Sequence, residues 1–250
     1  ETFHRDVARL APQLRRLYLT GGEPTMIRAN QQLVDQLIEA DNLDCRFSFT
    51  TNLTLWNPAF YEKIARFRSS EVQVSIDGLG VANDYMRAGS EWATLEKNFA
   101  HLLALPEHVA VTVFTVVQAC NAPSLDKLVL WLLETSKRRP LTWYPIPLDY
   151  PFTLQAALLP RASRERAVEE LTRIGSGLDG EAQRKIGHGL QEAVKFLKRE
   201  LPRDKKYYFD FLLGEARDHE LLISQLDLLD AARGTNWQKA LPELVECLCP

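Results

Sequence analysis

Five short runs of apolar and β-branched residues recur along the first 150 residues, and a longer amphipathic stretch separates each run from the next. The runs are RRLYLT (15–20), CRFSFTT (45–51), EVQVSID (71–77), VAVTVFTVVQ (109–118) and LTWYPIPL (141–148). The stretches 29–40, 57–67, 90–105 and 123–136 place apolar residues at helical spacing. Strands that alternate with helices predict βα units and a parallel α/β sheet, with right-handed crossovers that place the helices on its outer face.

The pattern changes after residue 150. The segments 163–178, 181–201 and 207–234 are charged on one face and apolar on the other, which predicts helices. We interpret the charges within 161–206 as solvated helix faces, and a weak basic docking surface is the alternative. The sequence thus predicts an α/β domain over 1–150 and a mostly helical C-terminal extension over 151–250.

Composition and charge exclude some classes of protein. No apolar run approaches the roughly 20 residues that span a bilayer, which argues against a membrane protein. The net charge of −3, from 30 basic and 33 acidic residues, argues against nucleic acid as a partner. The four cysteines are Cys45, Cys120, Cys247 and Cys249. A chain of this size needs no disulfide staples, so we interpret them as reduced thiols of a cytoplasmic protein.

Hydrogen-bonding residues gather where the predicted strands end. In a parallel α/β sheet or barrel, ligands bind at this edge. The groups are Gly21-Gly22-Glu23-Pro24, Thr50-Thr51-Asn52, Ser75 with Asp77-Gly78, Gln118 with Asn121, and Asp149.

Each of these groups also has an ordinary structural explanation. Gly21-Gly22 fits a tight βα turn, Asn52 can cap a turn, and Asp77-Gly78 is a common turn dipeptide. Ser75 fits a core hydroxyl. Because the groups recur at the ends of successive strands, we favour a shared site over separate turns.

Glu23 is the residue that a turn does not require. It follows two glycines, where a backbone without Cβ atoms lets a ligand approach closely. A carboxylate beside exposed carbonyl groups suits a ligand with an ammonium group.

Four segments, in order, resemble the radical S-adenosylmethionine (SAM) enzymes, in particular the twitch/SPASM-like branch that modifies peptides. YLTGGEP (18–24) is similar to the GGEP motif, and FTTNLTLWN (49–57) to the segment with the TN pair. VQVSIDGLGVANDYMRAGSEWATLEKNF (72–99) resembles the SIDG stretch with its downstream arginine, and FTVVQACN (114–121) the fifth-strand segment. The resemblance covers about residues 15–150.

The resemblance implies a partial (β/α)6 barrel over 1–150 that binds SAM beside a [4Fe–4S] cluster. It implies reductive cleavage of SAM to a 5′-deoxyadenosyl radical, which abstracts hydrogen from the side chain of a peptide or protein substrate. An external electron donor such as flavodoxin or ferredoxin is implied as a partner.

Residues that match positions of the family's motifs are assigned the functions that those positions have in the family. The resemblance implies that the SAM amino group binds at Gly21, Gly22 and Glu23, with Pro24 where the chain leaves the turn. It implies that the SAM carboxylate and ribose bind at Ser75 and Arg87, and that Asn52 and Asp77 face SAM or substrate. It places Val117, Gln118 and Asn121 near the ribose and adenine. A carboxylate suits a guanidinium fork. For Arg87, a solvated charge at a helix end is the alternative.

The cysteines depart from the family's pattern. The family holds its cluster with CxxxCxxC after the first strand, and residues 1–250 contain no such motif. We therefore expect the cluster cysteines upstream of Glu1, and we expect the chain to be catalytically inert without them. The extension 151–250 contains only Cys247 and Cys249, so an auxiliary cluster is not expected there.

Two other functions stay open. The first is a non-catalytic binding or scaffold protein on a radical-SAM-like barrel that has lost the cluster. The second is a different (β/α) barrel enzyme that binds phosphate at the glycine turn. Glu23 argues against the phosphate site, because its carboxylate would repel the anion.

Overall fold

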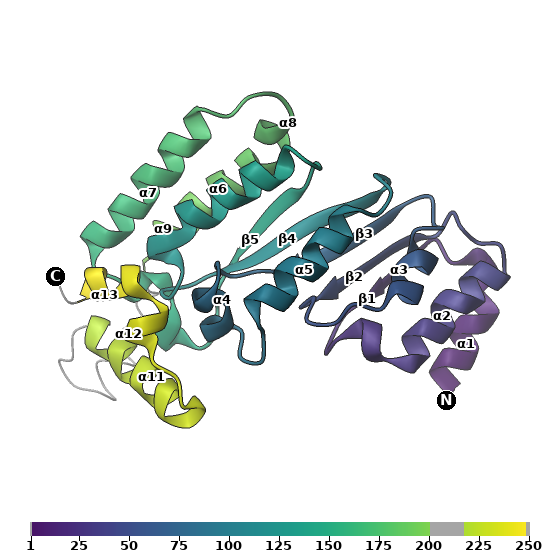
Figure 1. Cartoon of the computed structure of the whole chain (residues 1–250), viewed down its shortest axis with the longest axis horizontal. Coiled ribbons are helices and arrows are strands. Elements are labelled where there is room, and N and C mark those ends of the chain that lie inside the picture. The colour runs from purple at the N-terminus through teal and green to yellow at the C-terminus, as the bar shows by residue number, and fades with distance from the viewer. Residues whose placement is uncertain (1, 201–217, 249–250) are drawn as a thin grey trace. The chain divides into compact units, whose positions relative to one another are not determined.

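The chain alternates strands and helices up to residue 147 (Figure 1). The computed structural model describes residues 2–200 and 218–248. All five predicted strands are confirmed. After α1 (Thr2–Leu10), the elements are β1 (Arg16–Leu19), α2 (Arg28–Glu39), β2 (Arg46–Thr51), α3 (Pro58–Ile64), β3 (Ser70–Ser75), α4 (Val81–Met86), α5 (Trp92–Leu103), β4 (Val109–Val117), α6 (Leu125–Ser136) and β5 (Thr142–Pro147).

The strands form one parallel sheet in the order β1-β2-β3-β4-β5. The predicted α/β class is therefore confirmed. Each strand lies beside the next one in the sequence, so right-handed crossovers carry all the connecting helices to one face. A doubly wound sheet would instead reverse its strand order. This order is the one that a (β/α) barrel uses, although the described sheet is open at β1 and β5.

The chain divides into two compact units, which are described separately below. Unit 1 contains residues 1–75 and 90–113, and unit 2 contains residues 76–89 and 114–250.

The described elements after residue 150 are helical. They are the short turns Phe152–Leu154 and Ala156–Leu158, α7 (Arg161–Ser176), α8 (Gly180–Ala182), a π-helical turn (Gln183–Gly187), α9 (His188–Leu197), α11 (Asp218–Arg233), α12 (Trp237–Ala240) and α13 (Pro242–Leu248). Part of the predicted helix 207–234, residues 207–217, lies outside the described residues.

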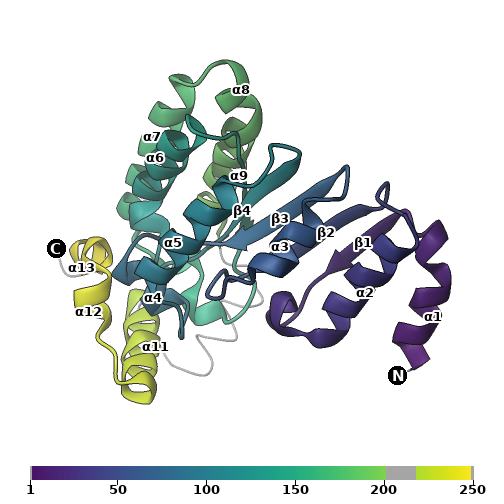
Figure 2. The same ribbon diagram turned by 45° about the vertical axis from the view of Figure 1, so that its right-hand side comes forward.

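Aromatic side chains of β2 and α3 form the core of unit 1. The ring of Phe49 meets that of Phe60 edge to face, with centroids 5.4 Å apart, and Phe47 stacks on Phe67 at the same distance. Asn57 caps α3 by accepting a hydrogen bond from the Phe60 N–H at 3.2 Å, as the sequence predicts. In Figures 1 and 2, α2 and α3 lie beside β1 and β2. This packing holds the end of β2 in place.

In unit 2, helix α9 packs so closely on β5 that only glycine fits at one position. A Cβ atom on Gly189 would lie 2.6 Å from the Trp143 carbonyl oxygen and 2.8 Å from its ring. Trp143 is buried, and its indole N–H donates to the Thr115 hydroxyl at 2.9 Å. The contact therefore cannot be relieved by moving a flexible side chain.

Gly189→Ala is expected to lower the free energy of unfolding by about 1–3 kcal/mol, because overpacking outweighs the gain in helix propensity. Urea unfolding measures this change. Gly175→Ala is the matched control, since its Cβ would meet only Leu190 Cδ1 at an ordinary 3.7 Å. We expect that variant to be as stable as the wild type or slightly more stable. Equal effects of the two substitutions would contradict the close approach at Trp143.

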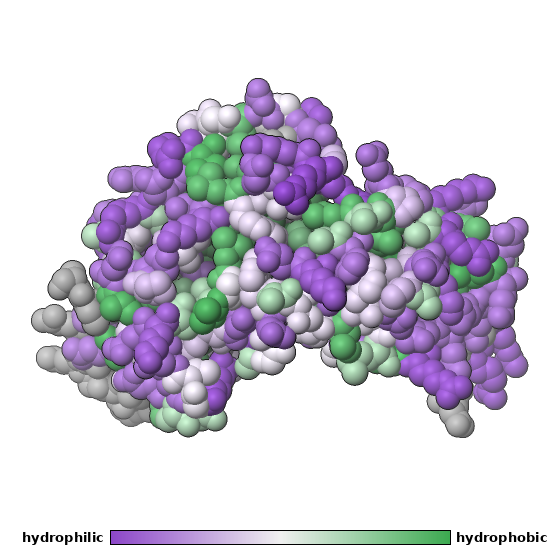
Figure 3. All heavy atoms as spheres, in the orientation of Figure 1, coloured by the Kyte–Doolittle hydropathy of each residue, from purple (hydrophilic) through white to green (hydrophobic). Residues whose placement is uncertain are grey.

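The sequence pattern missed α4, whose six residues are too few to show a helical period. No described helix is long and apolar enough to cross a membrane. On the face shown in Figure 3, hydrophilic residues predominate and hydrophobic residues form scattered patches.

Candidate functional site

The turn after β1 in unit 1 requires its glycines. Gly21 and Gly22 have φ angles of 89° and 57°, in the left-handed region that favours glycine. Both are exposed, and the space where their Cβ atoms would lie is open. Glu23 then caps the short 3₁₀ turn η2 (Pro24–Met26), in which Pro24 is buried. The turn therefore presents bare backbone next to a carboxylate.

The Glu23 carboxylate accepts four hydrogen bonds, all from uncharged donors. Its Oε1 accepts from the Thr25 hydroxyl at 2.7 Å and the Thr25 N–H at 3.3 Å. Its Oε2 accepts from the Thr51 hydroxyl at 2.9 Å and the Asn52 N–H at 3.1 Å. None of the ion pairs formed by the described residues includes Glu23. The carboxylate is held in place, but its charge is not neutralised.

Tyr61 shows how this charge acts on its surroundings. Burial raises the pKa of the Tyr61 phenol, the negative charge of Glu23 raises it further, and the Thr51 hydroxyl lowers it. Tyr61 therefore keeps its proton to a higher pH than an exposed tyrosine does.

The side chain of Asn52 does cap a turn. Its Oδ1 accepts from the Thr54 N–H at 3.1 Å and from the Thr54 hydroxyl at 2.8 Å. Leu53 is buried with a left-handed φ of 56°, and its carbonyl accepts from Asn98 Nδ2 at 2.9 Å. Asn52 thus contacts Glu23 through its backbone N–H, and its side chain caps the turn. Ser75 ends β3, and its hydroxyl makes no hydrogen bond with the described residues.

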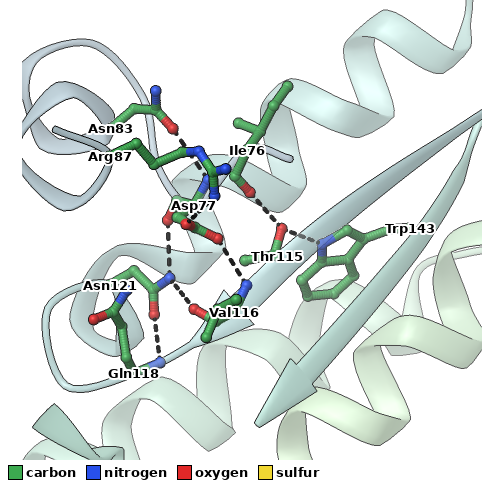
Figure 4. A network of polar contacts seen from close by, with 9 residues as sticks. All are labelled: Ile76, Asp77, Asn83, Arg87, Thr115, Val116, Gln118, Asn121 and Trp143. Carbon is green, nitrogen blue, oxygen red and sulfur yellow. Dashed lines mark hydrogen bonds and ion pairs between the residues drawn. The ribbon is translucent and has the colours of Figure 1, made fainter. Parts of the chain in front are cut away.

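In unit 2, Asp77 is the centre of a buried polar network (Figure 4). Its Oδ1 accepts from the Val116 N–H at 2.7 Å, and its Oδ2 accepts from Arg87 Nη1 at 2.8 Å. Its N–H donates to Asn83 Oδ1 at 3.1 Å, and its carbonyl accepts from Asn121 Nδ2 at 2.9 Å. Both carboxylate oxygens and both backbone groups of Asp77 are therefore engaged within the protein.

Asn121 is engaged in the same way. Its Nδ2 donates to the carbonyls of Asp77 and Val116, and its Oδ1 accepts from the Gln118 N–H at 2.9 Å. Val117 is buried, and its carbonyl accepts from the Leu148 N–H at 3.0 Å. The side chain of Gln118 makes no hydrogen bond with the described residues. Asp77 and Asn121 thus hold the loop together, while Gln118 keeps its amide available.

Arg87 is only partly used by this network. The backbone N–H of Arg87 donates to the Asn83 carbonyl at 2.8 Å, and α4 ends at this hydrogen bond. Its side chain is 26% exposed, against 5% for Asp77, so it is not a fully solvated charge at a helix end. Among the described residues, Nε and Nη2 of Arg87 have no hydrogen-bond partner. Two donors of the guanidinium thus remain for an anionic group.

The described cysteines do not fit a [4Fe–4S] cluster. Cys45, Cys120 and Cys247 are buried, unpaired thiols, and Cys249 lies outside the described residues. Burial raises the pKa of Cys45 and raises that of Cys120 to about 12, which disfavours the thiolate that binds iron. Within residues 2–200 and 218–248, no three His, Cys, Asp or Glu side chains gather as metal ligands would.

The predicted residues fall in both units, and hydrogen bonds join Glu23 to Asn52 in unit 1 and Asp77 to Arg87 and Asn121 in unit 2, whereas no contact joins Ser75 to the Glu23 turn among the described residues. Unit 1 contains Gly21, Gly22, Glu23, Pro24, Asn52 and Ser75, and unit 2 contains Asp77, Arg87, Val117, Gln118 and Asn121.

Sequence reasoning missed two supporting residues. Thr25 lies two residues after Glu23, the position from which a threonine bonds to a capping carboxylate, so a capping pattern could have indicated it. Asn83 lies in the short helix that the pattern missed, and no signal in the sequence marks it.

Comparisons with known proteins do not assign a function to these residues. No model of a known protein family matches the chain, and no curated protein sequence matches it.

Proposed function

We propose that this chain binds SAM and is the SAM-binding barrel of a radical SAM enzyme. The observation that carries the proposal is the Glu23 carboxylate, which no cation neutralises among the described residues and which follows two exposed glycines in left-handed conformation. The resemblance of residues 15–150 to that family, with strands in barrel order, adds to this support.

An ammonium group suits this turn for electrostatic reasons. The carbonyl groups of Gly21 and Gly22 accept no hydrogen bond from the described residues, so they remain available as acceptors. The Thr25 N–H bond to Glu23 is long, at 3.3 Å, and an ammonium would replace it with a stronger charge-assisted bond. A phosphate at the same turn would be repelled by Glu23, which disfavours a phosphate-binding function.

The other predicted contacts of SAM remain proposals, made for each unit by itself: Ser75 lies in unit 1, and Arg87, Gln118, Asp77 and Asn121 lie in unit 2. Arg87 has two free donors for a carboxylate, and Ser75 has a hydroxyl with no partner among the described residues. Gln118 has an amide that can bind a ribose or adenine edge. Asp77 and Asn121, whose polar atoms are engaged, would act by orienting Arg87 and the 116–121 loop.

The radical chemistry rests on a cluster that the described cysteines do not fit. A [4Fe–4S] cluster, if the complete protein holds one, would supply the electron for cleavage of SAM, and the proposed substrate is a peptide or protein side chain. The thiolates and an external electron donor would have to come from outside the described residues. The second candidate function is a non-catalytic SAM-binding or scaffold protein.

Glu23→Gln is expected to weaken SAM binding about 10- to 100-fold, the effect of losing one charged hydrogen bond. Calorimetric titration of the purified chain measures the affinity. Glu96→Gln is the matched control, because Glu96 is an exposed carboxylate of unit 1 without an ion pair among the described residues. An analogue of SAM without the α-amino group should bind both variants and the wild type alike.

An equal loss of affinity for SAM and for the deaminated analogue would show that Glu23 acts only through the fold. To separate the two candidate functions, iron and sulfide are supplied anaerobically to the protein expressed from its complete gene, followed by SAM and dithionite. Formation of 5′-deoxyadenosine supports the enzyme. SAM binding without this product supports the non-catalytic protein.

A further inference from the structure

We infer that Arg233, at the end of α11, is a positioning residue that holds the last turn of α4 and thereby sets where the guanidinium of Arg87 lies. The inference gives the C-terminal helices a role in ligand binding. It rests on the proposed function for the identity of the ligand, a carboxylate-bearing adenosyl compound. All the contacts that carry it lie within unit 2.

The first contact joins α11 to the end of α4. Arg233 Nη1 donates to the carbonyl oxygen of Tyr85 at 3.3 Å, two residues before Arg87. The last carbonyl groups of a helix have no partner within the helix, and a cation there is favourable. The guanidinium of Arg233 therefore supplies a donor that α4 cannot supply itself.

The corner between α11 and α12, at which the exposed Arg233 lies, is held by several hydrogen bonds. Asp230 Oδ2 accepts from the Trp237 N–H and Oδ1 from the Thr235 hydroxyl, both at 2.7 Å. Gly234 makes the turn with a left-handed φ of 67°. Trp237 is 2% exposed, and its indole N–H donates to Asp227 Oδ1 at 2.9 Å. Helix α12, which Trp237 begins, packs against α4.

The second link joins α4 to the polar network. Asn83, which is fully buried in α4, accepts from the Asp77 N–H, and its carbonyl accepts from the Arg87 N–H. Arg87 in turn pairs with Asp77. A shift of the last turn of α4 would therefore move Arg87 relative to Asp77 and change the direction of its two free donors.

The electrostatics of the buried Cys120 thiol agree with this position of Arg233. After burial, which has the largest effect, the charge of Arg233 lowers the pKa of Cys120 and the charge of Asp77 raises it. The charges of both side chains thus affect the pKa of this thiol. Among the described residues, Arg233 forms no ion pair that would neutralise its charge.

The test compares SAM with decarboxylated SAM, which keeps the sulfonium and amino groups but lacks the carboxylate. The wild type should prefer SAM by about 10-fold or more, the effect of one charge-assisted hydrogen bond. Arg233→Ala should reduce this preference at least about 3-fold, with the affinity for decarboxylated SAM unchanged. Arg233→Lys, which keeps a charged donor, should restore part of the preference. Lys239→Ala, which removes an exposed cation from α12, is the control and should change nothing.

A ligand-free measurement accompanies the titration. In Arg233→Ala, amide hydrogen exchange over α4 should become about 10-fold faster, and the NMR signal of the Arg87 Nε–H should shift. Unchanged exchange, an unchanged Arg87 signal or an unchanged preference would each overturn the inference. If the wild type binds neither adenosyl compound, the proposed function is wrong, and the ligand-free measurement still decides whether Arg233 holds α4 and Arg87.

Discussion

Replacing Asp77 with alanine is expected to lower the free energy of unfolding by about 3–5 kcal/mol, the cost of removing one partner of a buried charged pair. The substitution would leave the Arg87 guanidinium partly buried and unpaired. It would also remove the acceptor of the Val116 N–H, which donates to Asp77 Oδ1 at 2.7 Å. Chemical denaturation of purified protein measures the change.

Asp44→Ala provides the matched control for Asp77→Ala. Asp44 pairs with Arg68 at 2.6 Å, but the side chains are 73% and 78% exposed. Such a surface pair contributes about 1 kcal/mol or less. Similar losses for the two alanine variants would contradict the structural role of the Asp77 network. Asp77→Asn keeps one acceptor and should lie between the wild type and Asp77→Ala.

The second large effect is a loss of stability at alkaline pH that depends on Cys120. Burial is the main cause that raises the pKa of Cys120 from 9.0 to about 12. Between these two values the unfolded chain loses the thiol proton while the folded chain keeps it. The contribution of Cys120 to stability is therefore complete below pH 9 and is lost as the pH rises toward 12.

The expected loss is about 1.4 kcal/mol for each pH unit, or on the order of 4 kcal/mol over the whole range. It is measured by urea unfolding of the wild type and Cys120→Ala at several pH values from 8 to 11. Tyr61, whose pKa is also raised by burial, is present in both proteins and cancels in the comparison. Burial is the main cause that raises the pKa of Tyr85, and the charge of Cys120 adds to it, so the Tyr85 contribution changes together with that of Cys120. Parallel pH profiles of the two proteins would contradict the burial of a protonated thiol.

The strands of this fold could be predicted because their signal is local. Each buried strand is a short apolar run, and the intervening helices have a clear period, so the parallel sheet follows from sequence patterns alone. The short helix α4 could not be found in this way. Its six residues include the buried Asn83 and Tyr85, and it packs against α12, which is distant in the sequence.

The sequence indicated where the candidate site residues lie along the chain, but it did not indicate which hydrogen bonds they make. Gly21, Gly22 and Glu23 stand out because a turn needs glycine but does not need a carboxylate. The partners of Asp77 could not be predicted, because its bond to Val116 joins residues 39 positions apart and depends on the register of neighbouring strands. For Asn52, the sequence indicated a turn and the resemblance implied a side chain that faces SAM or substrate, and the structure adds the contact of its backbone N–H with Glu23.

The distinction between Arg87 and Asp77 also required the structure. From the sequence, Asp77 follows a predicted strand and Arg87 lies ten residues further along the chain, and the resemblance implies that both face a ligand. Their hydrogen bonds separate them, since Asp77 has no free carboxylate oxygen while Arg87 keeps Nε and Nη2 available. A ligand contact is therefore proposed for Arg87, and a positioning role for Asp77.

A crystal structure of the chain grown with SAM would show whether Glu23 binds the ammonium group. We expect the ammonium nitrogen to lie about 3 Å from a carboxylate oxygen of Glu23, within hydrogen-bonding distance of a carbonyl group of Gly21 or Gly22. Ordered SAM bound away from this turn, with the four hydrogen bonds of Glu23 unchanged, would contradict this expectation.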